Sequence, residues 1–276
     1  MLLTSVWTKV SGVKLHALTA GEGPPIVLLH GWPTQAFLWR RMMPRLAAKH
    51  RVIAIDLPGF GDSDKPLDAS YSFRYYREML DGALEQLGVA ETGLVVHDLG
   101  GPAGLYWASQ QPERVTRLGL TNTLIYPEIS LFLKGVILGL ATPGLRAAAT
   151  HPWSIRKAIQ VGMADASKIS KEDLAKYSSQ FQEPQARRAL AKAITNFSPK
   201  GFEEVAGYIK ALKVPARMIY GRRDWALPDI ANTVARLRAD LPAMEITELA
   251  DCGHFLQEER PEEVAEMLAV FFEAEK

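Results

Sequence analysis

Three features are scarce or absent in this sequence: cysteine, long apolar runs and an excess of charge of one sign. The single cysteine, Cys252, cannot form an internal disulfide, so we expect a small buried residue in a protein of a reducing compartment. The apolar stretch 131–140 falls short of the ~20 residues that span a bilayer, and we expect it to line a pocket or pack on the main domain. Lys and Arg number 32 against 31 Asp and Glu, which leaves no basic stripe for nucleic acid or an anionic membrane.

Residues 1–10 also lack the basic region and long apolar core of a signal peptide, so a cytoplasmic location is expected. These absences together favour a small neutral organic molecule, and water, as the partners of the protein. They predict no nucleic-acid partner, no membrane partner, no cofactor and no metal. They leave a homodimer open.

The order of apolar patterns predicts the fold class. Strands are predicted at 26–29, 51–55, 94–96, 115–121, 216–220 and 244–249, after a hairpin of residues 5–10 and 13–19. Helices are predicted between and after them at 36–49, 72–87, 230–241 and 261–275. This alternation predicts an α/β fold with a mostly parallel central sheet flanked by helices. Residues 124–212 show helical patterns without a strand, so we expect a helical cap inserted into a main domain of residues 1–123 and 213–276.

The stretch 94–104 carries the clearest chemical signal. An apolar strand runs into Asp98, and small residues from Gly100 onward begin a helix, which is the setting of a nucleophile elbow. A carboxylate there is ionised at neutral pH and needs no base, unlike a serine. Its attack on an acyl group would give a reactive anhydride, whereas attack on an epoxide or alkyl halide carbon gives an ester that water can hydrolyse. The alternative is that Asp98 only caps the helix that follows.

Two further polar residues follow predicted strands, Asp224 after 216–220 and His254 after 244–249. In an open α/β sheet these strand ends share one edge, so the three side chains are expected to converge in the order nucleophile, acid, histidine. The alternatives are a turn residue for Asp224, with Asp229 as the second candidate acid, and a helix-start residue for His254.

The chain resembles the α/β-hydrolase superfamily, specifically its epoxide hydrolase and haloalkane dehalogenase branch. The resemblance rests on five motifs, which are His30-Gly31-Trp32-Pro33, residues 56–66, His97-Asp98-Leu99-Gly100-Gly101, residues 221–224 and residues 252–258. It implies that Asp98 is the nucleophile, that His254 activates water against the ester and that Asp224 orients His254. It also implies an oxyanion hole made by the backbone N–H groups of Trp32 and Leu99.

The leaving group is less well defined by the resemblance. Haloalkane dehalogenases usually carry Asn and Trp side chains where this chain has Trp32 and Leu99, although the Trp32 indole remains a candidate donor to a halide. An epoxide oxygen needs an acid instead, which cap tyrosines supply in similar epoxide hydrolases.

Residues 188–195, where such a tyrosine is expected, contain none. The candidate acids in the cap are Tyr177, which we favour, Tyr126 and Tyr208. We predict an epoxide hydrolase that forms a covalent alkyl ester and releases a diol. The alternatives are a haloalkane dehalogenase and a non-catalytic small-ligand receptor on the same fold.

Overall fold

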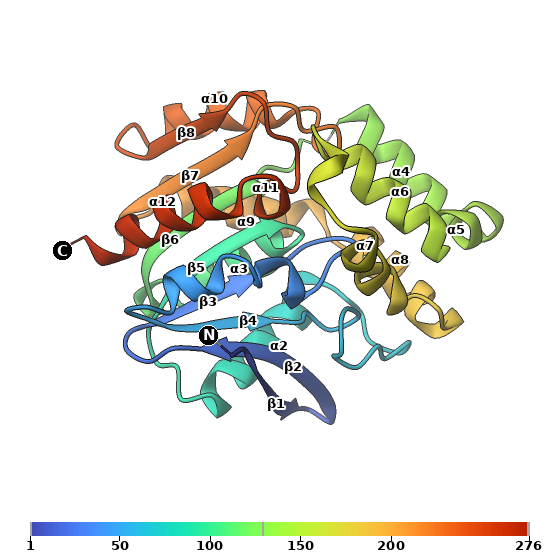
Figure 1. Cartoon of the computed structure of the whole chain (residues 1–276), viewed down its shortest axis with the longest axis horizontal. Helices are drawn as coiled ribbons and strands as arrows, with labels where there is room; N and C mark the ends of the chain where they lie inside the picture. The colour runs from blue at the N-terminus through green and yellow to red at the C-terminus, as the bar shows by residue number, and fades with distance from the viewer. Residues whose placement is uncertain (1, 129, 275–276) are drawn as a thin grey trace.

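An eight-stranded sheet runs through the centre of the chain (Figure 1). The computed structural model describes residues 2–128 and 130–274. The strands lie in the order β1-β2-β4-β3-β5-β6-β7-β8, with the first two antiparallel and the other six parallel to one another. They are β1 (Thr4–Val10), β2 (Val13–Ala20), β3 (Pro25–Leu29), β4 (Arg51–Ile55), β5 (Thr92–Asp98), β6 (Val115–Thr123), β7 (Ala216–Gly221) and β8 (Glu245–Leu249). The predicted hairpin, strands and fold class are confirmed.

Strand β5 lies in the middle of the parallel part of the sheet, between β3 and β6. All seven of its residues are buried, because helices cover both faces of the sheet and leave no side of this strand in water. Its apolar residues Leu94, Val95 and Val96 pair in register with both neighbours. The chain therefore holds Asp98 at the carboxyl end of its most deeply buried strand.

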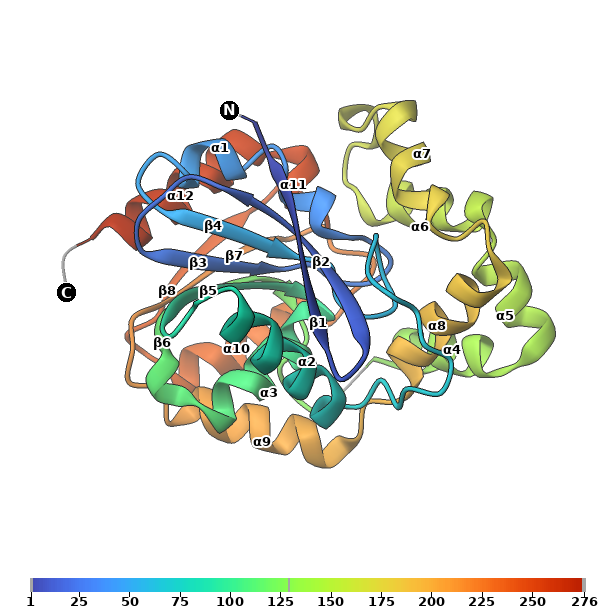
Figure 2. The ribbon, with the colours of Figure 1, turned by 90° about the horizontal axis from the view of Figure 1, so that it is seen from below.

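Two layers of helices flank the sheet (Figure 2). One face carries α1 (Met43–Leu46) and α12 (Pro261–Glu273), which pack on each other. The other carries α2 (Phe73–Gln86), α3 (Gly100–Gln110), α9 (Pro199–Lys210) and α10 (Ile230–Asp240). Helix α2 begins where predicted, since the Ser72 hydroxyl accepts from the Tyr75 N–H at 3.3 Å. Short 3-10 turns, η2 (Pro112–Arg114) and η3 (Ala166–Lys168), and the unpredicted helix α11 (Leu256–Glu259) complete the chain.

Five helices lie beside the sheet rather than on its faces (Figures 1 and 2). They are α4 (Leu131–Ala141), α5 (Pro143–Ala149), α6 (Pro152–Gly162), α7 (Lys171–Ser179) and α8 (Pro184–Thr195). Helix α9 also falls within residues 124–212, the range expected for the cap, but it packs against α3 on a face of the sheet. We use "cap" below for α4 to α8.

The helix expected over residues 36–49 is wrong in its continuity. The chain forms a 3-10 turn, η1 (Ala36–Trp39), and then the short helix α1. Pro44 lies in the first turn of α1, where its missing N–H costs nothing. Within a longer helix, the same proline would remove a hydrogen bond and clash with the preceding turn.

The expected burial of residues 131–140 is also largely wrong. In α4 only Leu133 and Leu140 are buried, and the helix packs against α5 and α8. No single helix in the described ranges is long and apolar enough to cross a membrane. The pair α4 and α5 meets the length and composition criteria only together, across a bend of 107°.

Candidate active site

The backbone at Asp98 has the strained turn of a nucleophile elbow. Its φ of 48° lies in the left-handed region, which non-glycine residues rarely adopt. The Thr123 hydroxyl donates to the Asp98 carbonyl oxygen at 2.7 Å and so supports the turn from β6. Gly31 passes so close that a Cβ atom there would lie 2.3 Å from Asp98 Cβ. The elbow lifts the carboxylate off the sheet and against the loop that follows β3.

The Asp98 carboxylate is held by a loop amide and by an imidazole. The Trp32 backbone N–H donates to Oδ1 at 2.6 Å, and His254 Nε2 lies 3.5 Å from Oδ2. Burial favours the neutral acid, but His254 and the Leu99 amide outweigh it and lower the pKa of Asp98. Asp98 is a buried residue, with 12% of its side-chain surface exposed. The group is an ionised carboxylate with backbone amides beside it.

His254 lies between two carboxylates. Its Nδ1–H donates to Asp224 Oδ2 at 2.8 Å, on the side opposite to Asp98. Burial lowers the pKa of His254, but the charge of Asp224 and then that of Asp98 raise it to about 10. The imidazole is therefore protonated on both nitrogens, and positively charged, at neutral pH, while both carboxylates are ionised. The structure brings together the three residues singled out in the sequence.

Asp224 owes its orientation to a residue that sequence reasoning missed. Asn122, at the end of β6, donates from Nδ2 to Asp224 Oδ2 at 2.7 Å and accepts from the Gly221 N–H at 2.9 Å. The Leu227 N–H donates to the other carboxylate oxygen at 2.7 Å. Asp229, the second candidate acid, is instead the half-buried residue before α10. The only signal for Asn122 was its place at a strand end.

His97 is a second histidine at the site that sequence reasoning left without a role. Its ring lies 4.6 Å from that of His254, and its Nδ1–H donates to the Thr121 carbonyl at 3.1 Å. Burial, together with the neighbouring His254 charge, lowers the pKa of His97 to about 3. It is therefore neutral, and it packs beside the charged imidazole without competing for its proton.

The loop that carries His254 is bonded to the cap. The His254 backbone N–H donates to the carbonyl oxygen of Gly162, the last residue of α6, at 2.7 Å. Glu259 accepts from the Gly253 N–H at 2.8 Å and from the Asp165 N–H at 2.9 Å. The bond between Asp165 and Glu259 joins residues 94 positions apart in the chain. The cap therefore helps to fix the backbone beside the imidazole.

The hydroxyl of Tyr177, the favoured candidate acid, is hydrogen-bonded to residues outside the three-residue site. Its hydroxyl donates to Glu258 Oε1 at 2.5 Å and accepts from Arg40 Nη1 at 3.3 Å. Arg40 also forms ion pairs with Glu258, at 2.5 Å, and with Asp173 on α7, at 2.9 Å. Tyr177 is completely buried within this group, which joins α7 to α11. The hydroxyl stabilises the junction between the cap and the main domain.

The other two candidate tyrosines lie away from the elbow. The Tyr126 hydroxyl donates to Asp240 on α10 at 3.0 Å. Tyr208 lines a cavity of ≈ 700 Å³ with Val115 and Lys213, beside the amino ends of β6 and β7. That is the opposite edge of the sheet from the elbow. Within the described ranges no hydrogen bond joins these hydroxyls or that of Tyr177 to the three site residues, so the tyrosine-acid hypothesis gains no support.

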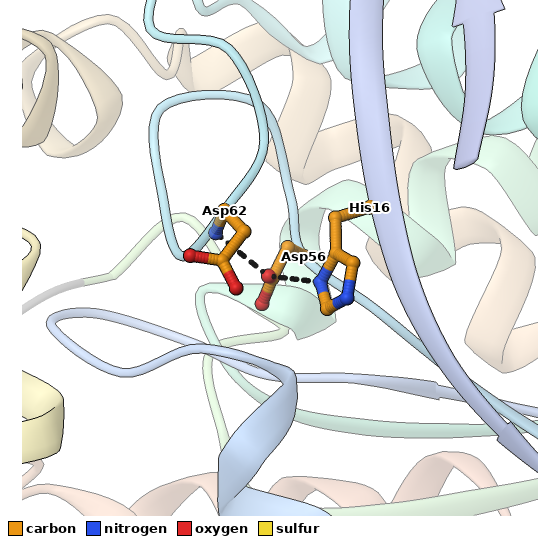
Figure 3. Close-up of side chains that lie close together, drawn as sticks. All are labelled: His16, Asp56 and Asp62. Carbon is orange, nitrogen blue, oxygen red and sulfur yellow. Dashed lines mark hydrogen bonds and ion pairs between the residues drawn. The ribbon is translucent and has the colours of Figure 1, made fainter. Parts of the chain in front are cut away.

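His16, Asp56 and Asp62 offer ligand atoms within 4.8 Å of one another, a spacing that suits a metal ion (Figure 3). However, Asp56 already accepts from the His16 ring at 2.7 Å, from the Asp62 N–H at 2.9 Å and from the Ala36 N–H at 2.6 Å. The other His16 nitrogen lies 2.9 Å from the Ser5 hydroxyl. These bonds explain the cluster as an anchor for the loop after β4, and we propose no metal there.

Residues 24–261, which contain the whole site, match the sequence model of the alpha/beta hydrolase fold. The chain belongs to this family. Soluble epoxide hydrolase of Corynebacterium sp. (strain C12) is 29% identical over 95% of this chain and 95% of its own. Haloalkane dehalogenase of Agrobacterium fabrum is 28% identical over 93% of this chain and 88% of its own. The solved structure of the epoxide hydrolase CorEH superimposes with a TM-score of 0.84 at 26% identity, covering 98% of this chain and 99% of that one.

The family thus includes epoxide hydrolases and haloalkane dehalogenases that are about equally similar to this chain. The similarity confirms the resemblance seen in the motifs. It does not select one reaction, because the two kinds of relative differ by one percentage point in identity.

Proposed function

We propose that the protein is a hydrolase in which Asp98 attacks an epoxide carbon and forms an alkyl ester. His254 then takes a proton from water, and the resulting hydroxide attacks the Asp98 carbonyl carbon. The Trp32 and Leu99 amides, which already face the carboxylate, would stabilise the tetrahedral oxyanion. Collapse of this intermediate breaks the bond between the Asp98 carbonyl carbon and the alkyl oxygen. The leaving oxygen takes the proton of the added hydroxyl, which restores the carboxylate and releases a diol.

The observation that carries the proposal is the position of His254 between two carboxylates, with Nδ1 2.8 Å from Asp224 Oδ2 and Nε2 3.5 Å from Asp98 Oδ2. Alkylation of Asp98 removes its negative charge, and with it one of the two carboxylates that raise the pKa of the imidazole. His254 should then lose its proton at the moment when a base is needed for the second step. The proton that His254 loses would pass to the epoxide oxygen, which becomes a hydroxyl as the ring opens, and His254 takes a proton back from water in the second step. A halide takes up none.

Single-turnover labelling in heavy-oxygen water tests the covalent step. Water that attacks the ester carbonyl leaves its oxygen in the Asp98 carboxylate, so a peptide containing Asp98 should gain mass after one turnover. Label found only in the product would reject the ester intermediate. Diol release from styrene-type epoxides, measured beside bromide release from bromoalkanes, identifies the leaving group. Binding of these compounds without any turnover would favour the receptor alternative.

One observation favours haloalkane dehalogenation as a second candidate. The Trp32 indole N–H is buried and has no hydrogen-bond partner among the described residues, although its backbone amide binds Asp98. An unpartnered N–H is suited to a departing halide. Trp32→Phe removes this donor and keeps an aromatic ring. Bromide release that depends on the indole would move the assignment to a dehalogenase.

A further inference from the structure

Helices α4, α5 and α6 of the cap expose an unusual amount of apolar surface. Six of the ten large hydrophobic side chains exposed in the described ranges lie on α4, α5 and α6. Their exposed fractions run from 55% to 84%. We call this the cap-tip surface, and its members are Leu131, Phe132, Leu138, Leu145, Trp153 and Val161. Both views place α5 at the end of the molecule farthest from the carboxyl terminus (Figures 1 and 2).

Helix α4 is apolar around most of its circumference, yet only two of its residues are buried. A helix of that composition is normally covered on all sides, by protein or by lipid. In α5 none of the seven residues is buried. Helix α5 packs against both α4 and α6, so the three helices form one continuous unit. The described residues leave much of the apolar surface of this unit uncovered.

Cations are spaced along the same exposed stripes as the apolar side chains. On α4, Lys134 lies between Leu131 and Leu138 at positions i, i+3 and i+7. On α6, Lys157 lies between Trp153 and Val161 at positions i, i+4 and i+8. Both lysines are exposed. Each stripe therefore presents one cation between two apolar side chains.

The segment that carries the cap-tip surface contains no acid. Between Glu128 and Asp165 the sequence has four cations and no Asp or Glu, in a chain with 31 acidic residues. These cations are Lys134, Arg146, Arg156 and Lys157. None of them forms an ion pair in the part of the chain that the structure describes. The local charge is thus strongly positive, although the whole chain is nearly neutral.

We propose that the cap-tip surface binds the interface of an anionic phospholipid membrane, with its apolar side chains among the acyl chains and its cations at the headgroups. Exposed Trp, Phe and Leu beside Lys and Arg are the features of interfacial helices. A symmetric contact with a second copy is less suitable, because it would bring the same cations against one another. The expectation of no membrane partner rests on the absence of spanning runs and basic stripes, and an interfacial surface requires neither.

The place of this surface gives it a connection to the chemistry. Val161 on α6 directly precedes Gly162, whose carbonyl oxygen accepts from the His254 backbone N–H at 2.7 Å. A membrane at the cap tip would concentrate lipophilic molecules near the helix that supports the site. The proposal goes beyond the proposed function and does not depend on it, since binding to a membrane requires no turnover.

Co-sedimentation with vesicles tests the proposal. We expect the full chain to bind vesicles of phosphatidylcholine mixed with phosphatidylserine at least roughly tenfold more tightly than phosphatidylcholine alone. Leu138→Asp combined with Leu145→Asp should abolish binding. Lys134→Glu with Lys157→Glu should weaken binding roughly 25-fold or more, at about fivefold for each lysine lost. The lysine pair tests the charge without altering the apolar surface.

Two matched controls lie outside the surface. Val270→Asp places an acid at an exposed apolar position on α12, and Lys213→Glu reverses an exposed lysine, so both should bind as the parent does. Asp98→Asn should also bind as the parent does, whichever reaction the site performs. The inference is wrong if anionic vesicles are not bound, or if the controls lose binding as the cap-tip variants do. A dimer that Leu138→Asp dissociates, in a protein that ignores vesicles, would assign the surface to a second copy instead.

Discussion

The carboxyl edge of the sheet buries polar side chains, whereas the outer helices of the cap expose apolar ones. At the edge, His254 and Asp224 are almost completely buried, and each has partners from other segments of the chain. At the cap tip, side chains such as Leu131 and Leu138 lie in the open beside cations without ion pairs. The charged groups at the edge thus have their hydrogen-bond partners within the chain. The cap-tip surface, in contrast, has apolar side chains that no described residue covers.

This contrast separates the effects of substitution. Changes at the edge should alter the chemical steps, whereas changes at the junction between cap and main domain should alter stability. The junction itself is small. It includes Arg40 with its two acidic partners, the bond between Gly162 and the His254 backbone, and the bonds of Lys192 to the carbonyl oxygens of Leu67 and Ala69.

The largest effect is expected at the nucleophile. Asp98→Asn removes the attacking carboxylate while keeping its size, so turnover should fall by roughly 10⁴-fold or more. Steady-state diol release measures it. Asp229→Asn, which changes an acid five residues beyond Asp224, should retain the parent's rate. Substantial activity in Asp98→Asn would show that another group attacks the substrate.

His254→Gln should separate the two chemical steps. Asp98 can still be alkylated, but without the base the ester should hydrolyse roughly 10²- to 10⁴-fold more slowly. Intact-protein mass spectrometry should therefore detect an adduct with the mass of the substrate. The double variant with Asp98→Asn should show none. An inactive His254→Gln protein without adduct would argue against the assigned role.

Arg40→Ala should weaken the junction at the cap. Glu258 is 1% exposed, and removing its cationic partner leaves a buried charge unpaired, at a cost of about 3 kcal/mol in the free energy of unfolding. Urea unfolding measures the loss. Arg222→Ala is the matched control, because its ion pair with Glu248 is exposed and should contribute less than about 1 kcal/mol. Equal losses in the two variants would mean that Arg40 does not hold the junction.

The proton on His254 predicts how stability depends on pH. The folded-state pKa of about 10 lies above the ordinary value of 6.5, so protonation stabilises the folded protein fully below pH 6.5. This contribution is lost as the pH rises from 6.5 through 10. Urea unfolding at both ends of that range should show a larger loss in the parent than in His254→Gln. The same loss in both proteins would contradict a charged imidazole.

The smallest effect is expected for Tyr177→Phe. Loss of the hydroxyl removes a hydrogen bond to Glu258, which should cost about 1 to 2 kcal/mol of stability. The rate of epoxide opening should stay at the parent's value, since this hydroxyl is engaged at the junction. Tyr208→Phe and Tyr126→Phe should also leave the rate unchanged. A sharp fall in ring opening for any of the three would restore the tyrosine-acid hypothesis.

The sheet could be predicted from the sequence because each strand carries its own signal. Apolar runs ended at Asp98, Asp224 and His254, and the shared edge of parallel strands brought them together. Asn122 and His97 could not be assigned roles in advance, since their partners come from other strands. Such contacts depend on the register between strands, which local patterns do not specify.

The cap could be predicted only as a run of helices. Helical periodicity shows which side of α4 is apolar, but here nearly every side is, so its burial was misjudged. The position of Tyr177 depends on how α7 docks through Arg40, an ion pair between segments 133 positions apart. The boundary at α9 likewise depends on packing against α3. These are tertiary contacts without a local sequence signal.

The bond between Gly162 and His254 limits how this chain could be recombined with its relatives. An exchange of caps between hydrolases assumes that the junctions between the cap and the main domain do not affect the active site. Here the junction at Gly162 supports the loop that carries His254. A Cβ atom at residue 162 would lie 2.7 Å from the buried Phe255 ring. A chimera joined after α6 would have to supply a glycine there and keep its carbonyl aimed at the loop. We expect a grafted cap without this junction to misplace the His254 imidazole, even though every residue assigned to the chemistry is still present in the sequence.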